Sequence, residues 1–268
     1  MSPVLLRKER IGPHLKVTLD DARRQNALSA EMVAEIDRAL EDSVGQDRSS
    51  FVIAGANGVF SAGADLKSVS EALSHSPLAG EANPLQASNR AGGQFFARLN
   101  AHPMVTVAVV DGPAFGGGMG LACCADVVIA TAHARFALSE TSLGLPPAQI
   151  TPYVVARIGL RHARRLALTG ARLDGKEAAA IGLADFYCES DAERDAQLEN
   201  LLGQIARCAP GANAVTKRLI LACGHGSPQD YIEEAARSFA ECLRGPEGRE
   251  GVAAFLEKRP ANWIGRTS

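Results

Sequence analysis

Long apolar runs and an excess of charge are both missing from this sequence. No stretch reaches the roughly 18 apolar residues that a membrane-spanning helix needs, and the N-terminal segment MSPVLLRKERIGPH does not have the pattern of an export signal. There are 28 Lys and Arg against 30 Asp and Glu, and the basic residues are scattered apart from a short cluster at Arg161–Arg165. We therefore expect a cytoplasmic protein with neither a membrane nor a nucleic acid as its partner.

Spacings typical of metal ligands or disulfides are also missing. The six cysteines show no Cys-x-x-Cys pattern and the six histidines are isolated, so we expect free thiols in a reducing cytosol and no metal site. No Gly-x-Gly-x-x-Gly follows the first expected strand, which disfavours a dinucleotide-dependent dehydrogenase. The 268 residues suffice for one large domain, with or without an appendage.

Glycine is abundant, and three of the 26 glycines stand together at Gly116–Gly118. They follow a break at Gly112-Pro113 and precede the small-residue segment Met119–Cys124. Because glycine lacks Cβ, the N–H of Gly117 can point into a pocket, and a helix starting there adds the positive end of its dipole. The segment indicates a site for an anion or oxyanion, although a tight turn is the commoner reason for such a triplet.

One carboxylate and a second small-residue turn accompany this segment. Glu140 ends the apolar stretch that begins at Phe136, which makes it a candidate acid/base, although a lone Glu in a loop is more often solvated surface. Gly63 and Ala64 directly precede Asp65 at the start of an expected helix. This turn is either a second place where backbone approaches a ligand or a simple strand-to-helix turn capped by Asp65.

The order of expected elements is typical of an α/β domain with parallel strands and a ligand at the strand ends. Apolar runs predict strands over Val4–Glu9, His14–Leu19, Ser50–Gly55, Val105–Val110 and Val127–Ala132. Ser70–Asn89 lacks periodicity and is expected to be a loop. Helical spacing predicts helices from Ser29 to about Gly45 and over Gln94–Leu99, Thr151–Ile158, Arg161–Leu168, Gly175–Ile181, Ala192–Cys208, Ala212–Cys223, Gln229–Leu243 and Glu247–Lys258.

Four segments form a more specific pattern when they are taken together. They are Arg24-Gln-Asn-Ala-Leu28-Ser, Phe60-Ser-Ala-Gly-Ala64-Asp-Leu-Lys67, Gly112-Pro-Ala-Phe-Gly116-Gly-Gly118 with Ala125-Asp126, and Glu247 through Trp263. In this order and spacing they resemble the enoyl-CoA hydratase/isomerase (crotonase) family over nearly the whole chain. The resemblance implies an α/β fold built as a spiral of β-β-α units over residues 1–200, followed by a helical region over residues 201–268 that builds homotrimers or homohexamers.

The resemblance also implies site residues for an acyl-CoA substrate. Ala64 and Gly117 would supply the two N–H groups that hold the thioester oxygen, and Glu140 would be the acid/base. Such donors stabilise the enolate through which hydration or double-bond migration passes, each by about 3–4 kcal/mol. No cofactor is implied beyond the CoA of the substrate, whose contacts would fall on Arg24, Ala27, Leu28, Ala62, Gly63, Asp65, Leu66, Gly116, Phe255 and Lys258.

The sequence departs from the family pattern at one position. Hydratases of the family commonly place two glutamates around the water, and the first of these positions is Gly120 here, whereas the second is Glu140. A single carboxylate can still serve, because the two proton transfers can be sequential. Ser139 is a candidate for holding the water in place of the missing glutamate.

A finer resemblance concerns the substrate. Leu138–Pro152 and Arg164–Gly170 are similar to the branch that hydrates 3-methylglutaconyl-CoA in leucine breakdown or isohexenylglutaconyl-CoA in acyclic terpene breakdown, and Pro146–Gln149 favours the terpene substrate. Hydration of a branched 2-enoyl-CoA is therefore the leading hypothesis. A double-bond isomerase, decarboxylase or thioesterase would use the same groups, and Gly120 keeps open a noncatalytic acyl-CoA binder.

Overall fold

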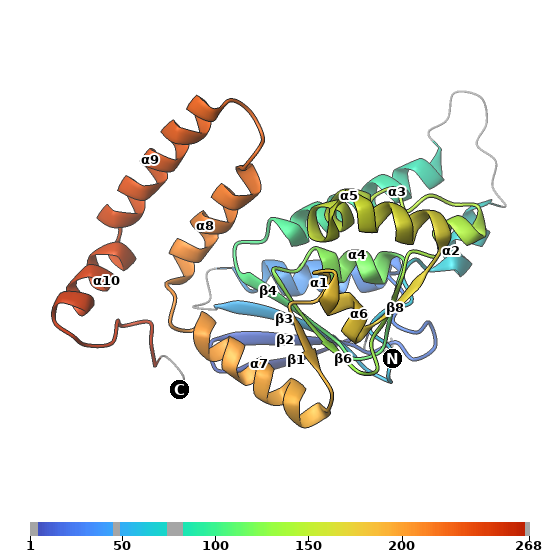
Figure 1. Cartoon of the computed structure of the whole chain (residues 1–268), viewed down its shortest axis with the longest axis horizontal. Helices are drawn as coiled ribbons and strands as arrows, with labels where there is room; N and C mark the ends of the chain where they lie inside the picture. The colour runs from blue at the N-terminus through green and yellow to red at the C-terminus, as the bar shows by residue number, and fades with distance from the viewer. Residues whose placement is uncertain (1–4, 45–48, 74–82, 266–268) are drawn as a thin grey trace.

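The computed structural model describes residues 5–44, 49–73 and 83–265. Its centre is a six-stranded sheet in the order β1-β2-β3-β4-β6-β9, drawn as arrows in Figure 1. Only β1 and β2 are antiparallel, and each later pair is parallel, so β2, β3, β4 and β6 end at the same edge. The strands are β1 Leu6–Ile11, β2 His14–Leu19, β3 Ser50–Gly55, β4 Val105–Val110, β6 Val127–Thr131 and β9 Phe186–Cys188.

Helices cover both faces of this sheet (Figure 1). Side chains alternate along β3, so that Phe51 and Ile53 enter the larger core while Val52 enters the smaller one. The smaller core lies under α7 and is completed by Leu198, Leu201, Leu202 and Ile205. The helices around the core are α1 Ala30–Glu41, α3 Pro84–Asn100, α4 Gly117–Cys123, α5 Thr151–Thr169, α6 Gly175–Ala180 and α7 Asp191–Ile205.

A second, three-stranded sheet positions the segment around the glycine triplet. It consists of β5 Pro113–Phe115, β7 Arg135–Ala137 and β8 Arg172–Asp174. Phe115 is paired with Ala137 in the parallel pair β5–β7, and the N–H of Gly116 donates to the carbonyl of Ala137 at 2.9 Å. Gly116, which directly follows β5, and Glu140, which comes three residues after β7, therefore lie side by side.

Most predicted elements are present, and the differences have local causes. Asn83 caps α3 at Pro84, so helix replaces the predicted loop over 84–89, and α2 Leu66–Leu73 occupies its other end. The rest of that loop, 74–82, lies outside the described residues, as do Val4 and Gly45. α5 corresponds to both helices predicted over 151–168, because Gly159 interrupts it with a φ of 71°.

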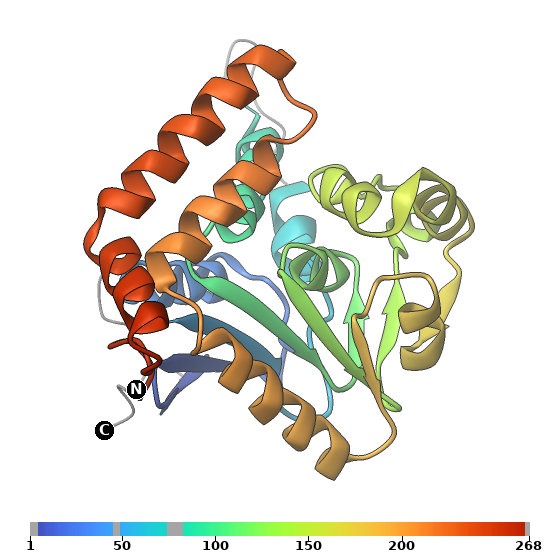
Figure 2. The ribbon, with the colours of Figure 1, turned by 60° about the vertical axis from the view of Figure 1, so that its left-hand side comes forward.

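The C-terminal helices α8 Pro210–Ala222, α9 Pro228–Arg244 and α10 Pro246–Leu256 stand beside the core (Figure 2). The predicted boundary after residue 200 falls inside α7, whose apolar side packs on the sheet. Lys217 of α8 is buried and joins the two parts: its Nζ donates to the carbonyls of His102, at 2.7 Å, and Met104, at 2.5 Å, and pairs with Asp126. These contacts lie just before β4, at the amino ends of the parallel strands. Over the described ranges, no helix is long and apolar enough to cross a membrane.

Candidate active site

Two loops at the carboxyl ends of β2 and β3 are bonded together. The N–H of Leu28 donates to the carbonyl of Gly63 at 2.7 Å, and the N–H of Ala62 donates to the carbonyl of Gln25 at 3.0 Å. Leu28 and Ala64 form a parallel bridge. The predicted CoA segment, residues 24–28, and the predicted first oxyanion segment, residues 62–66, are therefore one structural unit.

The turn between β5 and α4 brings the second predicted oxyanion amide to this unit. A Cβ placed on Gly63 would lie 2.9 Å from the nitrogen of Gly117, and one placed on Gly117 would lie 3.7 Å from the nitrogen of Ala64. Gly63 has a φ of 89°, and its Cβ would also collide with the carbonyl of Phe115, which explains the glycine. Within the part of the chain that the structure describes, neither the Ala64 nor the Gly117 amide donates a hydrogen bond. Two adjacent N–H groups are thus free to hold one oxygen.

Glu140 lies against the same turn. It begins a short 3-10 helix, Glu140–Leu143, and its Oε1 would be 2.9 Å from a Cβ on Gly116. Its Oε2 is buried and has no hydrogen-bond partner among the described residues. Burial raises the pKa of Glu140, and the hydrogen bond to its own backbone opposes this shift. A half-buried carboxyl with a raised pKa beside two free amides is suited to proton transfer.

The space beside Gly120 is filled by an aliphatic side chain. A Cβ on Gly120 would lie 2.2 Å from Cγ2 of Ile150, which is buried at the start of α5. Gly120 is one helical turn from Gly116, the residue that Glu140 touches. Ile150 thus occupies the position where a longer side chain at residue 120 would begin. The sequence analysis did not predict this contact, because the two residues are distant in the sequence. Ser139 directly precedes Glu140, and its predicted role with the water stays a prediction.

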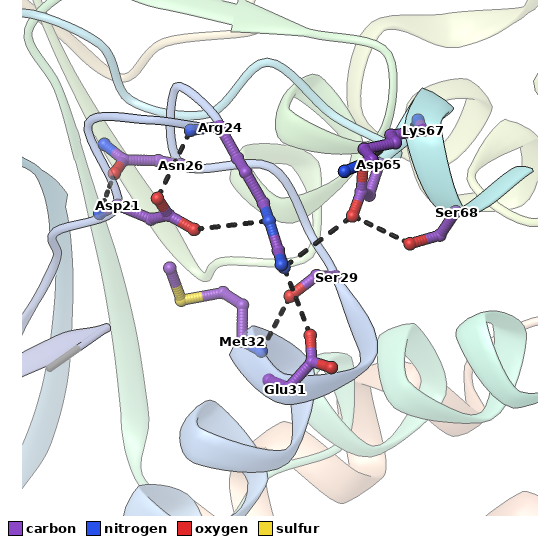
Figure 3. A network of polar contacts seen from close by, with 9 residues as sticks. All are labelled: Asp21, Arg24, Asn26, Ser29, Glu31, Met32, Asp65, Lys67 and Ser68. Carbon is purple, nitrogen blue, oxygen red and sulfur yellow. Dashed lines mark hydrogen bonds and ion pairs between the residues drawn. The ribbon is translucent and has the colours of Figure 1, made fainter. Parts of the chain in front are cut away.

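Arg24 is held among three carboxylates at the rim of the site (Figure 3). Its guanidinium lies 3.2 Å from Glu31, 3.7 Å from Asp65 and 3.9 Å from Asp21. The hydrogen bond to Glu31 is the main cause that raises the pKa of Arg24. Asp65 also accepts from Lys67 N and Ser68 Oγ at the start of α2, as expected of a cap. The predicted contacts Ala27, Leu28, Ala62 and Gly63 lie on the same two loops, Leu66 begins α2, and Gly116 adjoins them.

Two predicted CoA contacts are not brought to this region within the chain. Phe255, 83% exposed, and Lys258 lie at the end of α10, which packs on α9 and α8. Figure 1 shows α10 on the opposite side of the molecule from α2 and α4. The cause is the attachment of the C-terminal helices near the amino ends of the strands, whereas the site lies at their carboxyl ends. Within one chain these two residues therefore lie away from the Ala64 and Gly117 amides, and their contact with CoA stays a prediction.

Two buried polar residues support the loops and were not predicted as site residues. Asn26 is 1% exposed and has a φ of 55°, and its Nδ2 donates to the carbonyls of Ala56 and Val59 at 3.2 and 2.7 Å. Ser61 is fully buried and bonds to the carbonyl of Asn26. The available signal was an Asn in a polar turn, since Asn tolerates the left-handed conformation better than most residues.

Solved structures match the fold along nearly the whole chain. An enoyl-CoA hydratase/isomerase from Marinobacter aquaeolei has a TM-score of 0.92 at 40% identity, over 97% of this chain and 99% of that chain. Pseudomonas aeruginosa AtuE has a TM-score of 0.91 at 44% identity, over 97% of this chain and 100% of that chain. These likenesses confirm the predicted α/β class with a crotonase-like core and a C-terminal helical region.

Sequence comparison defines the class of enzyme. Human mitochondrial methylglutaconyl-CoA hydratase is 31% identical over 256 residues, which cover 92% of this chain and 72% of that protein. The family model for enoyl-CoA hydratase/isomerase matches residues 14–266. The chain belongs to the enoyl-CoA hydratase/isomerase family, as its four segments predicted, and like its relatives it is an enzyme of the hydro-lyase type.

Proposed function

We propose that this enzyme hydrates a branched 2-enoyl-CoA thioester through an enolate. The observation that carries the proposal is the position of the Glu140 carboxyl, which lies against Gly116, the residue directly before the free amide of Gly117. A base next to a pair of aligned donors suits a reaction in which negative charge develops on a carbonyl oxygen. CoA enters as part of the substrate, and the reaction needs no other cofactor.

We assign the following roles in the reaction to these residues. The thioester oxygen accepts hydrogen bonds from the N–H groups of Ala64 and Gly117. The Glu140 carboxylate takes a proton from water as the water oxygen bonds to C3, and the π electrons of C2=C3 move to form the enolate. Glu140 then gives its proton to C2 as the carbonyl reforms. The net change is addition of H and OH across the double bond, and the carboxylate is regenerated.

The surroundings of Glu140 support a mechanism with one carboxylate. Ile150 fills the space beside Gly120, and burial is the cause that raises the pKa of Glu140. A base that holds one proton at a time can remove it from water and deliver it to C2 in sequence. We therefore assign both proton transfers to Glu140.

Branched glutaconyl thioesters are the substrates that we propose, with isohexenylglutaconyl-CoA first and 3-methylglutaconyl-CoA second. The support is the form of Pro146–Gln149 and the similarity to a methylglutaconyl-CoA hydratase. In the structure, Gln149 Nε2 donates to Asn89 of α3 at 2.7 Å, so this segment is bonded to α3.

We also propose that the chain assembles as a homotrimer or homohexamer. Large apolar side chains are exposed on the C-terminal helices: Ile220, Ile232, Phe239, Phe255 and Leu256. Covering them in an assembly would bring α10 to another subunit, where Phe255 and Lys258 could contact CoA. Sedimentation velocity at several protein concentrations tests this, and a monomer throughout contradicts it.

The deciding experiment is a turnover screen of straight-chain, 3-methylglutaconyl and isohexenylglutaconyl thioesters, comparing the parent with Glu140→Gln. Hydration is read as loss of the conjugated-thioester absorbance with a mass gain of one water. We expect the parent to turn over a branched substrate and the variant to lose at least about 100-fold in kcat. Loss of conjugation without added water would indicate an isomerase, and saturable acyl-CoA binding without turnover would indicate a noncatalytic binder.

A further inference from the structure

Ser61 contacts every backbone segment that builds the proposed oxyanion site. It lies between β3 and α2, and its side chain is fully buried. We propose that Ser61 is a positioning residue that fixes the Ala64 and Gly117 amides relative to each other and to the CoA loop, residues 24–28. This inference rests on the proposed function, because it assigns the two amides to one substrate oxygen.

The hydroxyl of Ser61 joins the CoA loop to the first amide. Its Oγ donates to the carbonyl of Asn26 at 2.7 Å and accepts from the N–H of Gly63 at 3.2 Å. The Gly63 N–H is one residue before the Ala64 N–H, so this bond restrains the Ala62–Gly63 peptide, which directly precedes the peptide that carries the donor. A single hydroxyl therefore links the CoA loop and the donor segment.

The backbone of Ser61 joins the same unit to the second amide. Its N–H donates to the carbonyl of Pro113, and its carbonyl accepts from the N–H of Phe115, both at 3.0 Å. A Cβ on Gly118 would lie 2.3 Å from the Ser61 carbonyl oxygen and 2.9 Å from Ser61 Cβ. The start of α4, and with it Gly117, thus packs directly against Ser61, and only glycine fits at residue 118.

Catalysis requires the two amide donors to be positioned precisely, which is a stricter requirement than a stable fold. Oxyanion donors act only if they are held within about 0.5 Å of the productive position, and a misplacement of 1 Å can cost about 100-fold in rate. Removing the Ser61 hydroxyl frees the Gly63 N–H, whereas the backbone bonds that join the CoA loop to Ala62 and Gly63 remain. The loss is therefore expected in kcat, with little change in CoA affinity.

Ser61→Ala tests this against Ser50→Ala as a matched control. Ser50 is also fully buried and loses its side-chain bond to His14, at 2.8 Å, whereas Ser61 loses two such bonds. Ser50 stands at the amino end of β3, away from the proposed site. We expect Ser61→Ala to lower kcat by about 10- to 100-fold and Ser50→Ala by less than about 2-fold. Both variants should show similar losses in melting temperature, and both should keep the Kd of free CoA within about threefold of the parent value. Equal kcat values in the two variants would overturn the proposal.

A spectroscopic measurement separates this inference from the proposed function. Aligned donors lower the infrared stretching frequency of a bound thioester carbonyl, which can be read with carbonyl-labelled butyryl-CoA without any turnover. We expect a lowered frequency in the parent and in Ser50→Ala, and a smaller shift in Ser61→Ala. If the parent hydrates nothing but shows this pattern, the proposed function fails and the positioning role stands. An unchanged frequency in Ser61→Ala refutes the positioning role whatever the reaction is.

A second pair of variants approaches the contact from α4. Gly118→Ala places a methyl group against the Ser61 carbonyl, whereas Gly203→Ala places one on the open side of α7. We expect Gly118→Ala to lower kcat by at least about tenfold and to reduce the carbonyl shift, and Gly203→Ala to do neither. Parent-like kcat in a folded Gly118→Ala variant would contradict the role of this contact.

Discussion

At the scale of single residues, the proposed chemistry depends on the carboxyl group of Glu140, which is half-buried and poorly supplied with hydrogen-bond partners. Its Oε2 is buried without a partner among the described residues, and burial is the main cause of its raised pKa. The ionised form is the one that acts as base, so the site keeps a group whose charged state the fold disfavours. Such a conflict between stability and chemistry is expected at a catalytic carboxylate.

The pH dependence of stability follows from this conflict. Because the pKa of Glu140 is raised in the folded protein, ionisation costs stability above that pKa, and the cost disappears below the unfolded value of about 4.3. Glu140→Gln should therefore melt at a higher temperature than the parent at pH 8, and the two melting temperatures should converge as the pH falls towards about 4. Thermal scans across this range check the prediction. A parent that is the more stable protein at pH 8 would contradict it.

At the scale of elements, two glycines one turn apart on the short helix α4 and its N-cap each contact a side chain from another element. Gly116 takes the carboxyl of Glu140, and Gly120 takes the methyl groups of Ile150. These two side chains can pack this closely because residues 116 and 120 carry no Cβ. The same absence lets an aliphatic side chain stand where the family more often has a second glutamate.

The Gly120–Ile150 contact predicts strong coupling between two substitutions. Gly120→Ala should destabilise the protein by about 1–3 kcal/mol through overpacking, and Ile150→Ala by about 2–5 kcal/mol through a cavity. In the double variant the new methyl group enters the space left by Ile150, so the loss should be about 0.5–3 kcal/mol smaller than the sum. Urea unfolding of all four proteins measures this coupling. Strictly additive losses would show that the two side chains do not compete for the same space.

At the scale of the whole molecule, the core and the C-terminal helices are joined through a buried charge. Lys217 of α8 reaches the backbone before β4 and pairs with Asp126, which also accepts from the N–H of Thr106 at 2.7 Å. Burial lowers the pKa of Lys217, and Asp126 opposes that shift. The pair places the helices near the amino ends of the strands, away from the proposed active site.

Removing this lysine should loosen the C-terminal helices. Lys217→Met leaves the carbonyls of His102 and Met104 without this donor, so we expect a loss of about 1–3 kcal/mol in unfolding free energy and faster amide hydrogen exchange in α8, α9 and α10 than in the sheet. Lys176→Met, at an exposed position of α6, is the control and should change neither. Parent-like exchange in α8–α10 of Lys217→Met would show that another contact holds these helices.

Much of this organisation was predictable because it depends on local patterns. Apolar runs located β1, β2, β3, β4 and β6, and helical spacing located most helices, including α6, which begins with a capping box of Asp174 and Glu177. Glycines at 63 and 116 marked the turns, since only a residue without Cβ accepts these backbone angles and approaches. The predicted loop over 84–89 failed because Asn83 and Pro84 start a helix that its weak periodicity did not reveal.

The sequence by itself determined the family, the order of the main strands and most helices, and the three groups that we assign to catalysis, because motifs and turns are properties of consecutive residues. Only the tertiary structure decided that Ile150 fills the space at Gly120, that Ser61 joins three segments, and that Phe255 and Lys258 stand apart from the site. The physical reason is that close packing between residues distant in sequence depends on how whole elements are placed. No local pattern carries that information.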